Sequence, residues 1–248
     1  SVDDPTARVA DVLPSAFVRR LPEDRGFAAA ANEALVSVEG APFLLFVHDD
    51  VRLRPDAVTA MVAEAFRANA GVVGAKLVDW DDEHVLRSVG LAVDVFGSSV
   101  PLVDPGELDQ SQHDSARHVF AVSTACMLVR SDLFTTIDGF SAEIPFFGED
   151  VDLCWRVHIA GASVQFCPRA TVGHRERFSD RRPLEDRTRY ETRHETRMVL
   201  ANTELRRWWW TVPVGVVLGL VDLIGSALLG RPRHSGDVLA AGVWNLVH

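Results

Sequence analysis

The stretch that decides the fold is FLLFVHDD, residues 43–50, in which five apolar residues are followed at once by a histidine and two carboxylates. The apolar run is too short for a helix of its own and is rich in Phe, Leu and Val, so it predicts a buried β-strand. A buried strand that ends in acids places them at the carboxyl edge of a sheet, where open α/β sheets bind their ligands.

The two adjacent acids, Asp49 and Asp50, have two interpretations. Neighbouring carboxylates repel each other and lose hydration at a sheet edge unless a cation or hydrogen-bond donors lie between them. A hard divalent cation with a phosphate as co-ligand would suit such a site. The other interpretation is a strand that ends in a solvated acidic turn, and this stretch alone favours neither.

The composition fits a globular protein that does not act mainly on nucleic acid. The chain of 248 residues can bury a core, as one large domain or as a domain with an appendage. Its net charge is -10, and no basic block occurs in the first 170 residues, which argues against nucleic acid as the main partner. Cys126, Cys154 and Cys167 match neither a zinc site nor a disulfide framework, which indicates a reducing compartment.

Strand and helix signals alternate in the first part of the chain. Residues 16–21 (AFVRRL) predict a short strand, and residues 28–35 have strong helix propensity. After the strand at 43–47, residues 54–56 open another helix, and residues 71–78 predict the next strand. This alternation predicts an α/β fold with a doubly wound, mostly parallel sheet flanked by helices.

Two later segments complete the predicted sheet. Residues 79–118 are polar and acidic with several glycines and prolines, which is typical of a functional or mobile connection. Residues 119–129 are apolar again and predict a central strand.

A second informative stretch is PFFGEDVDLCWR, residues 145–156, where Glu149, Asp150 and Asp152 crowd the start of a predicted helix. The helix dipole alone accounts for acids in a first turn. The aromatic, glycine-containing approach favours a second interpretation, in which a tight loop presents one carboxylate into a cleft.

The C-terminal part of the chain changes character. Residues 181–207 are rich in arginine, typical of a basic helix at a membrane surface or of a solvated helix. Residues 208–229 begin with three tryptophans and continue apolar except for Asp222 and a few small residues. They would span about 33 Å as a helix, which predicts a transmembrane helix with interfacial anchors. The alternative is a buried core helix; in a membrane, Asp222 should face protein.

Four motifs follow one another in an order and rough spacing that resemble the family 2 glycosyltransferases. They are residues 25–32 (RGFAAAAN), His48-Asp49-Asp50, residues 148–156 (GEDVDLCWR) and His174. The resemblance covers Ala16 to about Tyr190 and is to the bacterial, rhamnosyl- and galactofuranosyl-transferase-like branch, which builds cell-wall polysaccharides.

The resemblance implies a GT-A fold, a nucleotide-sugar donor, a divalent metal (Mn²⁺ or Mg²⁺) and inversion at the anomeric carbon. The acceptor would be a cell-wall, polysaccharide or glycolipid glycan. The implied roles are Asp150 as catalytic base, Glu149, Trp155 and Arg156 at the acceptor, Arg25, Asn32 and Asp49 at the donor, and Asp50, His174 and His48 at the metal. His48 stands where the family's Asp-x-Asp signature has its first acid.

The resemblance also implies a domain organisation. Residues 1–180 would be a catalytic domain that lacks its first strand or strands, because the family's base-binding strand is expected before Ser1. Residues 1–6 would be the remnant of the Asp-rich turn after the family's second strand. A basic juxtamembrane helix (181–207), a transmembrane helix (208–229) and the start of a further, truncated segment (230–248) would follow. We therefore expect a poor enzyme in isolation, located at the cell membrane with its catalytic domain in the cytoplasm.

Two rival functions remain compatible with these residues. A metal-dependent nucleotidyltransferase or phosphohydrolase also uses carboxylates at strand ends. An inactive, membrane-anchored scaffold of glycosyltransferase type is the rival that is not an enzyme.

Overall fold

A computed structural model of the protein describes residues 6–38, 40–94, 98–176, 184–202, 206, 208–229, 236, 240–242 and 244–245. The helices are α1 Thr6–Val12, α2 Phe27–Asn32, α3 Ala34–Ser37, α4 Ala57–Ala68, α5 Ser131–Thr136, α6 Glu149–Ile159, α8 Leu184–Asn202 and α9 Trp208–Leu228. The strands are β1 Phe43–Val47, β2 Val51–Leu53, β3 Val72–Asp79, β4 Leu86–Ser88, β5 Leu91–Val93, β6 Ser99–Pro101, β7 Arg117–His118, β8 Cys126–Arg130 and β9 Val164–His174.

The central sheet is mixed, so the prediction of a mostly parallel sheet is wrong. Its strands lie in the order β1-β8-β3-β9-β2, with β4 paired to β3 and β7 paired to β9. Among the described strands, β3 and β9 form the one parallel pair, and all other pairs are antiparallel. The long excursion between β3 and β8 lets the chain reverse direction, and β8 then inserts antiparallel between β1 and β3.

The strand predicted at residues 16–21 does not form. These residues have no regular secondary structure. The side chains of Phe17 and Val18 are 80% and 37% exposed, so they are not buried against a neighbouring strand. Strand propensity without a partner does not stabilise a strand. The helix predicted at 28–35 forms in two short pieces, α2 and α3.

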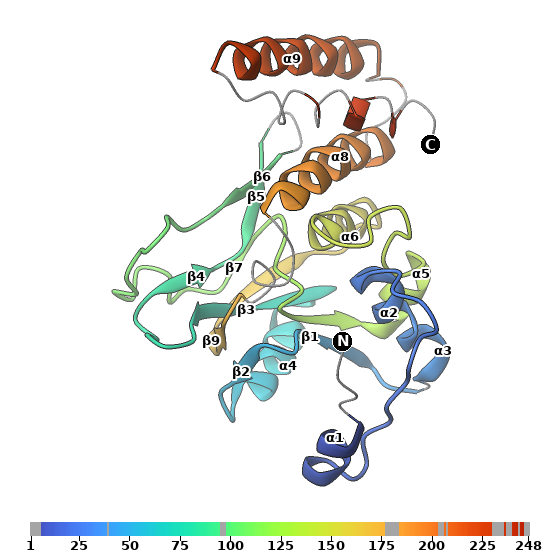
Figure 1. Cartoon of the computed structure of the whole chain (residues 1–248). Coiled ribbons are helices and arrows are strands. Elements are labelled where there is room, and N and C mark those ends of the chain that lie inside the picture. Colours follow the sequence, from blue (N-terminus) through green and yellow to red (C-terminus); the bar gives the residue numbers. More distant parts are fainter. Residues whose placement is uncertain are drawn as a thin grey trace.

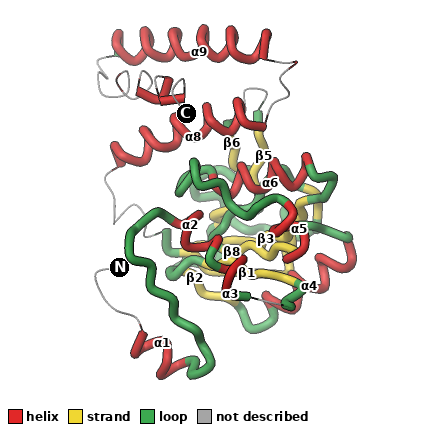
Figure 2. The backbone as a smooth tube through the Cα atoms, turned by 90° about the vertical axis from the view of Figure 1, so that its right-hand side faces the viewer, coloured by secondary structure: helices red, strands yellow, loops and turns green. Residues whose placement is uncertain are grey.

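Helices cover both faces of the sheet (Figures 1 and 2). On one face, Met61 of α4 belongs to an apolar cluster with Val73 of β3. On the other face, Phe134 of α5 and Leu153 of α6 belong to a second cluster that includes Phe166 of β9. α8 packs on α6, farther from the sheet (Figure 1). α6 therefore lies between the sheet and α8.

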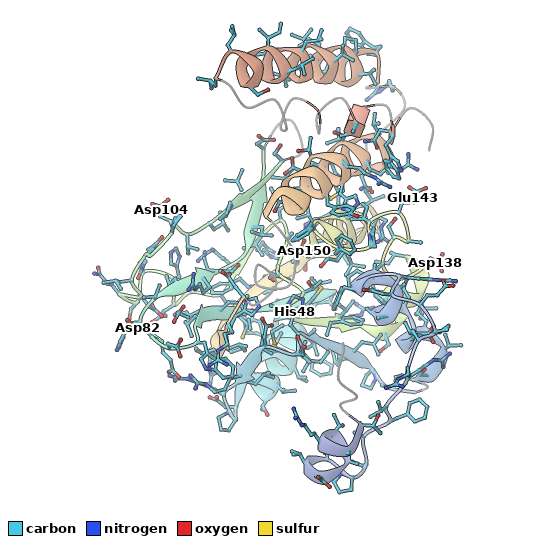
Figure 3. The ribbon with its side chains drawn as sticks, viewed as in Figure 1. His48, Asp82, Asp104, Asp138, Glu143 and Asp150 are labelled. Carbon is cyan, nitrogen blue, oxygen red and sulfur yellow. The ribbon has the colours of Figure 1, made fainter. Side chains whose placement is uncertain are left out.

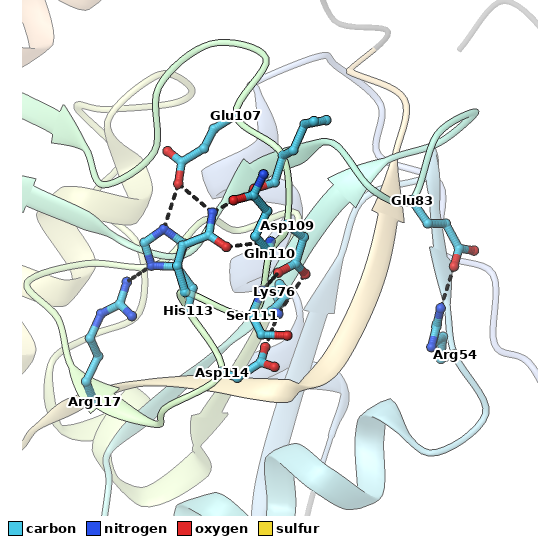
Figure 4. Close-up of polar contacts among 12 residues, drawn as sticks. Arg54, Lys76, Glu83, Glu107, Asp109, Gln110, Ser111, His113, Asp114 and Arg117 are labelled. Carbon is cyan, nitrogen blue, oxygen red and sulfur yellow. Dashed lines mark hydrogen bonds and ion pairs between the residues drawn. The ribbon is translucent and has the colours of Figure 1, made fainter.

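The connection at 79–118 is packed onto the sheet, and it contains β4 to β7. Lys76 of β3 is 4% exposed and donates hydrogen bonds to Asp109 (2.8 Å) and Asp114 (2.6 Å), which fasten the connection to the sheet (Figure 4). Burial alone would lower the pKa of Lys76, but the two carboxylates outweigh burial and raise this pKa. Lys76 therefore stays charged and holds the loop as an ionic anchor.

The C-terminal helices form, but the prediction of a transmembrane helix is not supported. In the part of the chain that the structure describes, no helix is both long and apolar enough to cross a membrane. The predictions for residues 1–5, for the side chain of Asp222 and for most of 230–248 lie outside the described residues.

Candidate active site

Three side chains from different strands meet at one edge of the central sheet. His48 follows β1, Asp50 precedes β2, and His174 ends β9. Because β2 pairs with β9 so that Val51 lies opposite His174, Asp50 lies beside His174. The distance from His174 Nε2 to Asp50 Oδ1 is 3.4 Å. One possible ligand atom from each of the three residues lies within 4.8 Å of the other two, so the structure brings the predicted metal residues together as a cluster.

The chemistry of this cluster fits a divalent cation. Imidazole and carboxylate together suit a borderline ion such as Mn²⁺. Burial, and then the proximity of His174, lowers the pKa of His48, so its ring is neutral and keeps a lone pair. The side chains of His174 and Asp50 are only 11% and 10% exposed, and His174 Nδ1 is buried without a hydrogen-bond partner. Asp50, His174 and His48 would therefore hold such an ion.

The acid pair Glu149–Asp150 lies at the N-terminus of α6, after a tight turn. Phe147 and Gly148 have positive φ angles of 58° and 103°. His194 of α8, which is 1% exposed, hydrogen bonds through Nδ1 to the carbonyl oxygens of Phe146 (2.8 Å) and Phe147 (3.1 Å). The helix predicted to begin at these acids is confirmed, and α8 holds the turn that presents them.

Glu149 is buried and Asp150 is half-buried, which changes the chemistry of both carboxyls. Glu149 is 7% exposed, and burial, followed by the charge of Asp150, raises the pKa of Glu149. Burial also raises the pKa of Asp150. Two neighbouring carboxyls with raised pKa values are more stable with one proton between them than with both groups ionised. Figure 3 labels Asp150 and His48 toward the middle of the molecule. A carboxyl with a raised pKa is suited to accepting a proton.

We expect Glu149→Gln to stabilise the protein at neutral and alkaline pH but not in acid. The pKa of Glu149 is raised on folding, so wild-type stability falls as pH rises through this pKa, whereas glutamine has no proton to lose. At about pH 9 the variant should melt about 2–4 °C higher, which corresponds to about 1 kcal/mol for a chain of this length. Below about pH 4, where glutamate is protonated even when unfolded, the difference should vanish.

Scanning calorimetry at the two pH values measures this effect. Glu23→Gln, at a glutamate whose side chain is 70% exposed, is the matched control and should show no such pH dependence. A Glu149→Gln shift of equal size at both pH values would contradict the burial of a titrating carboxyl.

Two predicted ligand-binding residues brace the loop before the acid pair. Asn32 donates from Nδ2 to the carbonyl of Phe140 and accepts from the Phe140 N–H, both at 2.8 Å. Arg156 donates from Nη1 to the carbonyls of Ile137 (2.8 Å) and Gly139 (2.7 Å). The structure therefore shows both side chains as positioning residues. Their predicted contacts with donor and acceptor stay predictions.

The other predicted site residues lie outside the cation cluster. Trp155 of α6 packs edge-on against Phe120, with ring centroids 5.4 Å apart. Asp49 is exposed next to His48. Arg25 has a 71% exposed side chain and lies 3.4 Å from Glu23. The donor and acceptor roles of these side chains stay predictions.

The strand predicted at 119–129 forms only in its last part, because residues 119–125 lie between two strands of the sheet. β7 ends at His118 and β8 begins at Cys126. The residues between them cross β3 at Gly74, where a Cβ would lie 2.3 Å from the Cβ of Val122. The missing side chain of Gly74 thus permits a close approach of this segment to the sheet.

This departure places Thr124, which the sequence analysis missed, between the two halves of the site. Thr124 is 2% exposed. Its Oγ1 donates to Glu149 Oε1 (3.0 Å) and lies 3.2 Å from His48 Nε2. The one signal in the sequence was the pair Ser123-Thr124 inside an otherwise apolar run.

Several solved structures share this arrangement of strands and helices. GalNAc-T7, solved with UDP, GalNAc and Mn²⁺, matches with a TM-score of 0.58 over 75% of this chain and 38% of its own, at 13% identity. A mannosyltransferase from Pyrobaculum calidifontis, solved with GDP-Man and Mn²⁺, matches with a TM-score of 0.55 over 97% of this chain and 73% of its own, at 14% identity. TarS from S. aureus matches with a TM-score of 0.53 over 96% of this chain and 68% of its own, at 18% identity. The protein therefore has a GT-A-like α/β fold.

The model of the family "Glycosyltransferase like family 2" matches residues 2–210. The chain belongs to the family 2 glycosyltransferases, as the motifs predicted. It is 31% identical over 172 residues to the uncharacterized protein y4gI of Sinorhizobium fredii, covering 65% of this chain and 18% of y4gI. It is 26% identical over 225 residues to the pre-mycofactocin glycosyltransferase of Mycobacterium tuberculosis, covering 85% and 45%.

The match to a third relative covers a larger share of that relative's length. The N-acetylglucosaminyl-diphospho-decaprenol L-rhamnosyltransferase of Mycobacterium tuberculosis is 24% identical over 232 residues, covering 82% of this chain and 75% of the relative. The chain spans less than half the length of the first two relatives.

Proposed function

We propose that this chain transfers a sugar from a nucleoside-diphosphate sugar to a hydroxyl group of a glycan or lipid-linked acceptor, with inversion and with a divalent metal. The observation that carries the proposal is that the His-Asp-His cluster and the Glu149–Asp150 pair are joined through Thr124. The Mn²⁺ and nucleotides bound in two solved structures of the same fold agree with it.

The proposed chemistry assigns each half of the site one task. When bound at Asp50, His174 and His48, the cation would offset the charge of the leaving nucleoside diphosphate. Asp150 takes the proton of the acceptor hydroxyl while its oxygen bonds to the anomeric carbon, and the bond from that carbon to the diphosphate oxygen breaks on the opposite face. Asn32 and Arg156 brace the loop at residues 137–140, which leads to the acid pair. The positioning of reacting groups carries much of the rate.

We place this reaction at the cytoplasmic face of the cell membrane. The name of the rhamnosyltransferase relative describes a decaprenol-linked acceptor, which is a lipid. α9 exposes large apolar side chains, among them Trp209 (77%), Val216 (57%) and Val221 (62%). A face of this kind suits contact with a lipid surface, and flotation with liposomes would test the contact directly.

A screen of UDP, GDP and dTDP, each with and without Mn²⁺, tests the proposed function. One nucleotide at about 100 times its dissociation constant should raise the melting temperature by roughly 5–10 °C, corresponding to about 2.7 kcal/mol, and only when Mn²⁺ is present. With the matching sugar nucleotide, release of the nucleoside diphosphate should depend on an added acceptor.

Two results would contradict the proposal and identify the rivals. Consumption of the sugar nucleotide by water at the full rate would indicate a phosphohydrolase. An unchanged melting temperature with every combination of nucleotide and Mn²⁺ would indicate a scaffold without catalytic function.

A further inference from the structure

A continuous hydrogen-bonded chain runs from the cation cluster to the acid pair. His48 Nε2 lies 3.2 Å from Thr124 Oγ1, and Thr124 Oγ1 lies 3.0 Å from Glu149 Oε1. Thr124 and Glu149 are 2% and 7% exposed, so water does not replace either contact easily. The three residues lie on separate segments, and the hydroxyl of Thr124 links the other two.

The hydrogen bonds that join His48, Thr124 and Glu149 can run in either of two directions, because the Thr124 hydroxyl has one proton to donate. In the first direction, His48 Nε2–H donates to Thr124, and Thr124 donates to Glu149. In the second, Glu149 donates to Thr124, and Thr124 donates to His48 Nε2. A neutral imidazole carries one N–H, so only the first direction leaves His48 Nδ1 with a lone pair. Glu149 Oε2, which is buried without a hydrogen-bond partner, remains available for a proton in that state.

We propose that Thr124 is a positioning residue that sets the tautomer of His48, so that His48 offers Nδ1 to the cation while Glu149 is held as a hydrogen-bond acceptor. This inference rests on the proposed metal site. Binding of a cation at His48 selects the first direction of the chain and thereby fixes Glu149, the neighbour of Asp150. Thr124 thus couples occupancy of the cation cluster to the arrangement of the acid pair.

The affinity for Mn²⁺ tests the coupling. It is measured on the full chain, prepared without metal, from the EPR signal of free Mn²⁺, with no sugar donor or sugar acceptor present. Thr124→Val replaces the hydroxyl by a methyl group of similar size. We expect it to weaken Mn²⁺ binding about 10- to 100-fold, the usual effect of losing a residue that orients a metal ligand. Thr124→Ser keeps the hydroxyl and should stay within about threefold of the wild type.

A second arm separates coupling from damage to the fold. In a His48→Ala background, Thr124→Val should cause no further loss of Mn²⁺ affinity, because the residue through which it acts is gone. Thr136→Val, which removes an exposed threonine hydroxyl that bonds the carbonyl of Asp132, is the matched control. It should bind Mn²⁺ like the wild type.

Three results would overturn the inference. Wild-type affinity in Thr124→Val shows that the hydroxyl does not orient His48. Equal losses in the valine and serine variants, or equal losses with and without His48, show a merely structural role. Absence of Mn²⁺ binding by the wild type overturns the inference together with the proposed metal site, whereas the first two results leave the proposed function standing.

Discussion

Replacement of Asp150 by asparagine is expected to lower the rate of sugar transfer by at least about 100-fold, the usual contribution of a general base. Asparagine has nearly the same shape, and the backbone N–H of Val151, which now donates to Asp150 Oδ1 at 2.8 Å, can still donate to an amide oxygen. The variant loses the negative charge of the carboxylate and with it the ability to accept a proton. Binding of the nucleotide with Mn²⁺ should therefore remain close to that of the wild type.

The pH dependence of the wild type gives a second test of the same role. Burial raises the pKa of Asp150, and a base must be ionised to act, so the rate should fall as pH drops through this raised value. Steady-state rates with the donor identified by the nucleotide screen measure both effects. Asp104→Asn, at an exposed loop residue far from Asp150 in Figure 3, is the matched control. More than about a tenth of the wild-type rate in Asp150→Asn would place the base elsewhere.

Replacement of Asp50 by alanine should weaken Mn²⁺ binding by at least about 100-fold, the upper end of the loss seen when a supporting residue is removed. Asp50 is the one carboxylate of the His-Asp-His cluster, and the ring of His48 beside it is neutral. The loss of Asp50 removes both a ligand and the negative charge that attracts a divalent ion. His174→Ala should weaken binding less, because it removes a ligand without removing a negative charge.

Titration of each variant with Mn²⁺, followed by EPR or calorimetry, measures this order. Asp104→Ala removes an exposed carboxylate and should leave the affinity unchanged. Unchanged affinity in both Asp50→Ala and His174→Ala would remove the proposed metal site. Loss of Mn²⁺ binding without loss of transfer would instead separate the metal from the reaction.

The sequence by itself determined the elements that carry this chemistry. The strand at 43–47 and the helix that begins at Glu149 both form where predicted. Their signals are local: a short apolar run ends in acids, and acids crowd the first turn of a helix. The order of the four motifs also identified the family, which the match over residues 2–210 confirms.

Only the tertiary structure decided which segments became neighbours. A strand pattern shows which side chains share a face, but it contains no record of the partner strand or its direction. The mixed sheet, the absence of a strand at the described residues 16–21 and the break before β8 were therefore not predictable from local patterns. The same reason hid the role of Asn32, whose partner Phe140 lies 108 positions away.

Thr124 shows this limit most directly. Its two partners, His48 and Glu149, lie 76 and 25 positions away, and nothing in its own neighbourhood specifies either of them. A threonine in an apolar run satisfies its hydroxyl wherever the fold supplies an acceptor, because a buried hydroxyl without one costs free energy. The residue types of the site are thus written in the sequence, whereas the connection between its two halves arises only when packing brings three distant segments together.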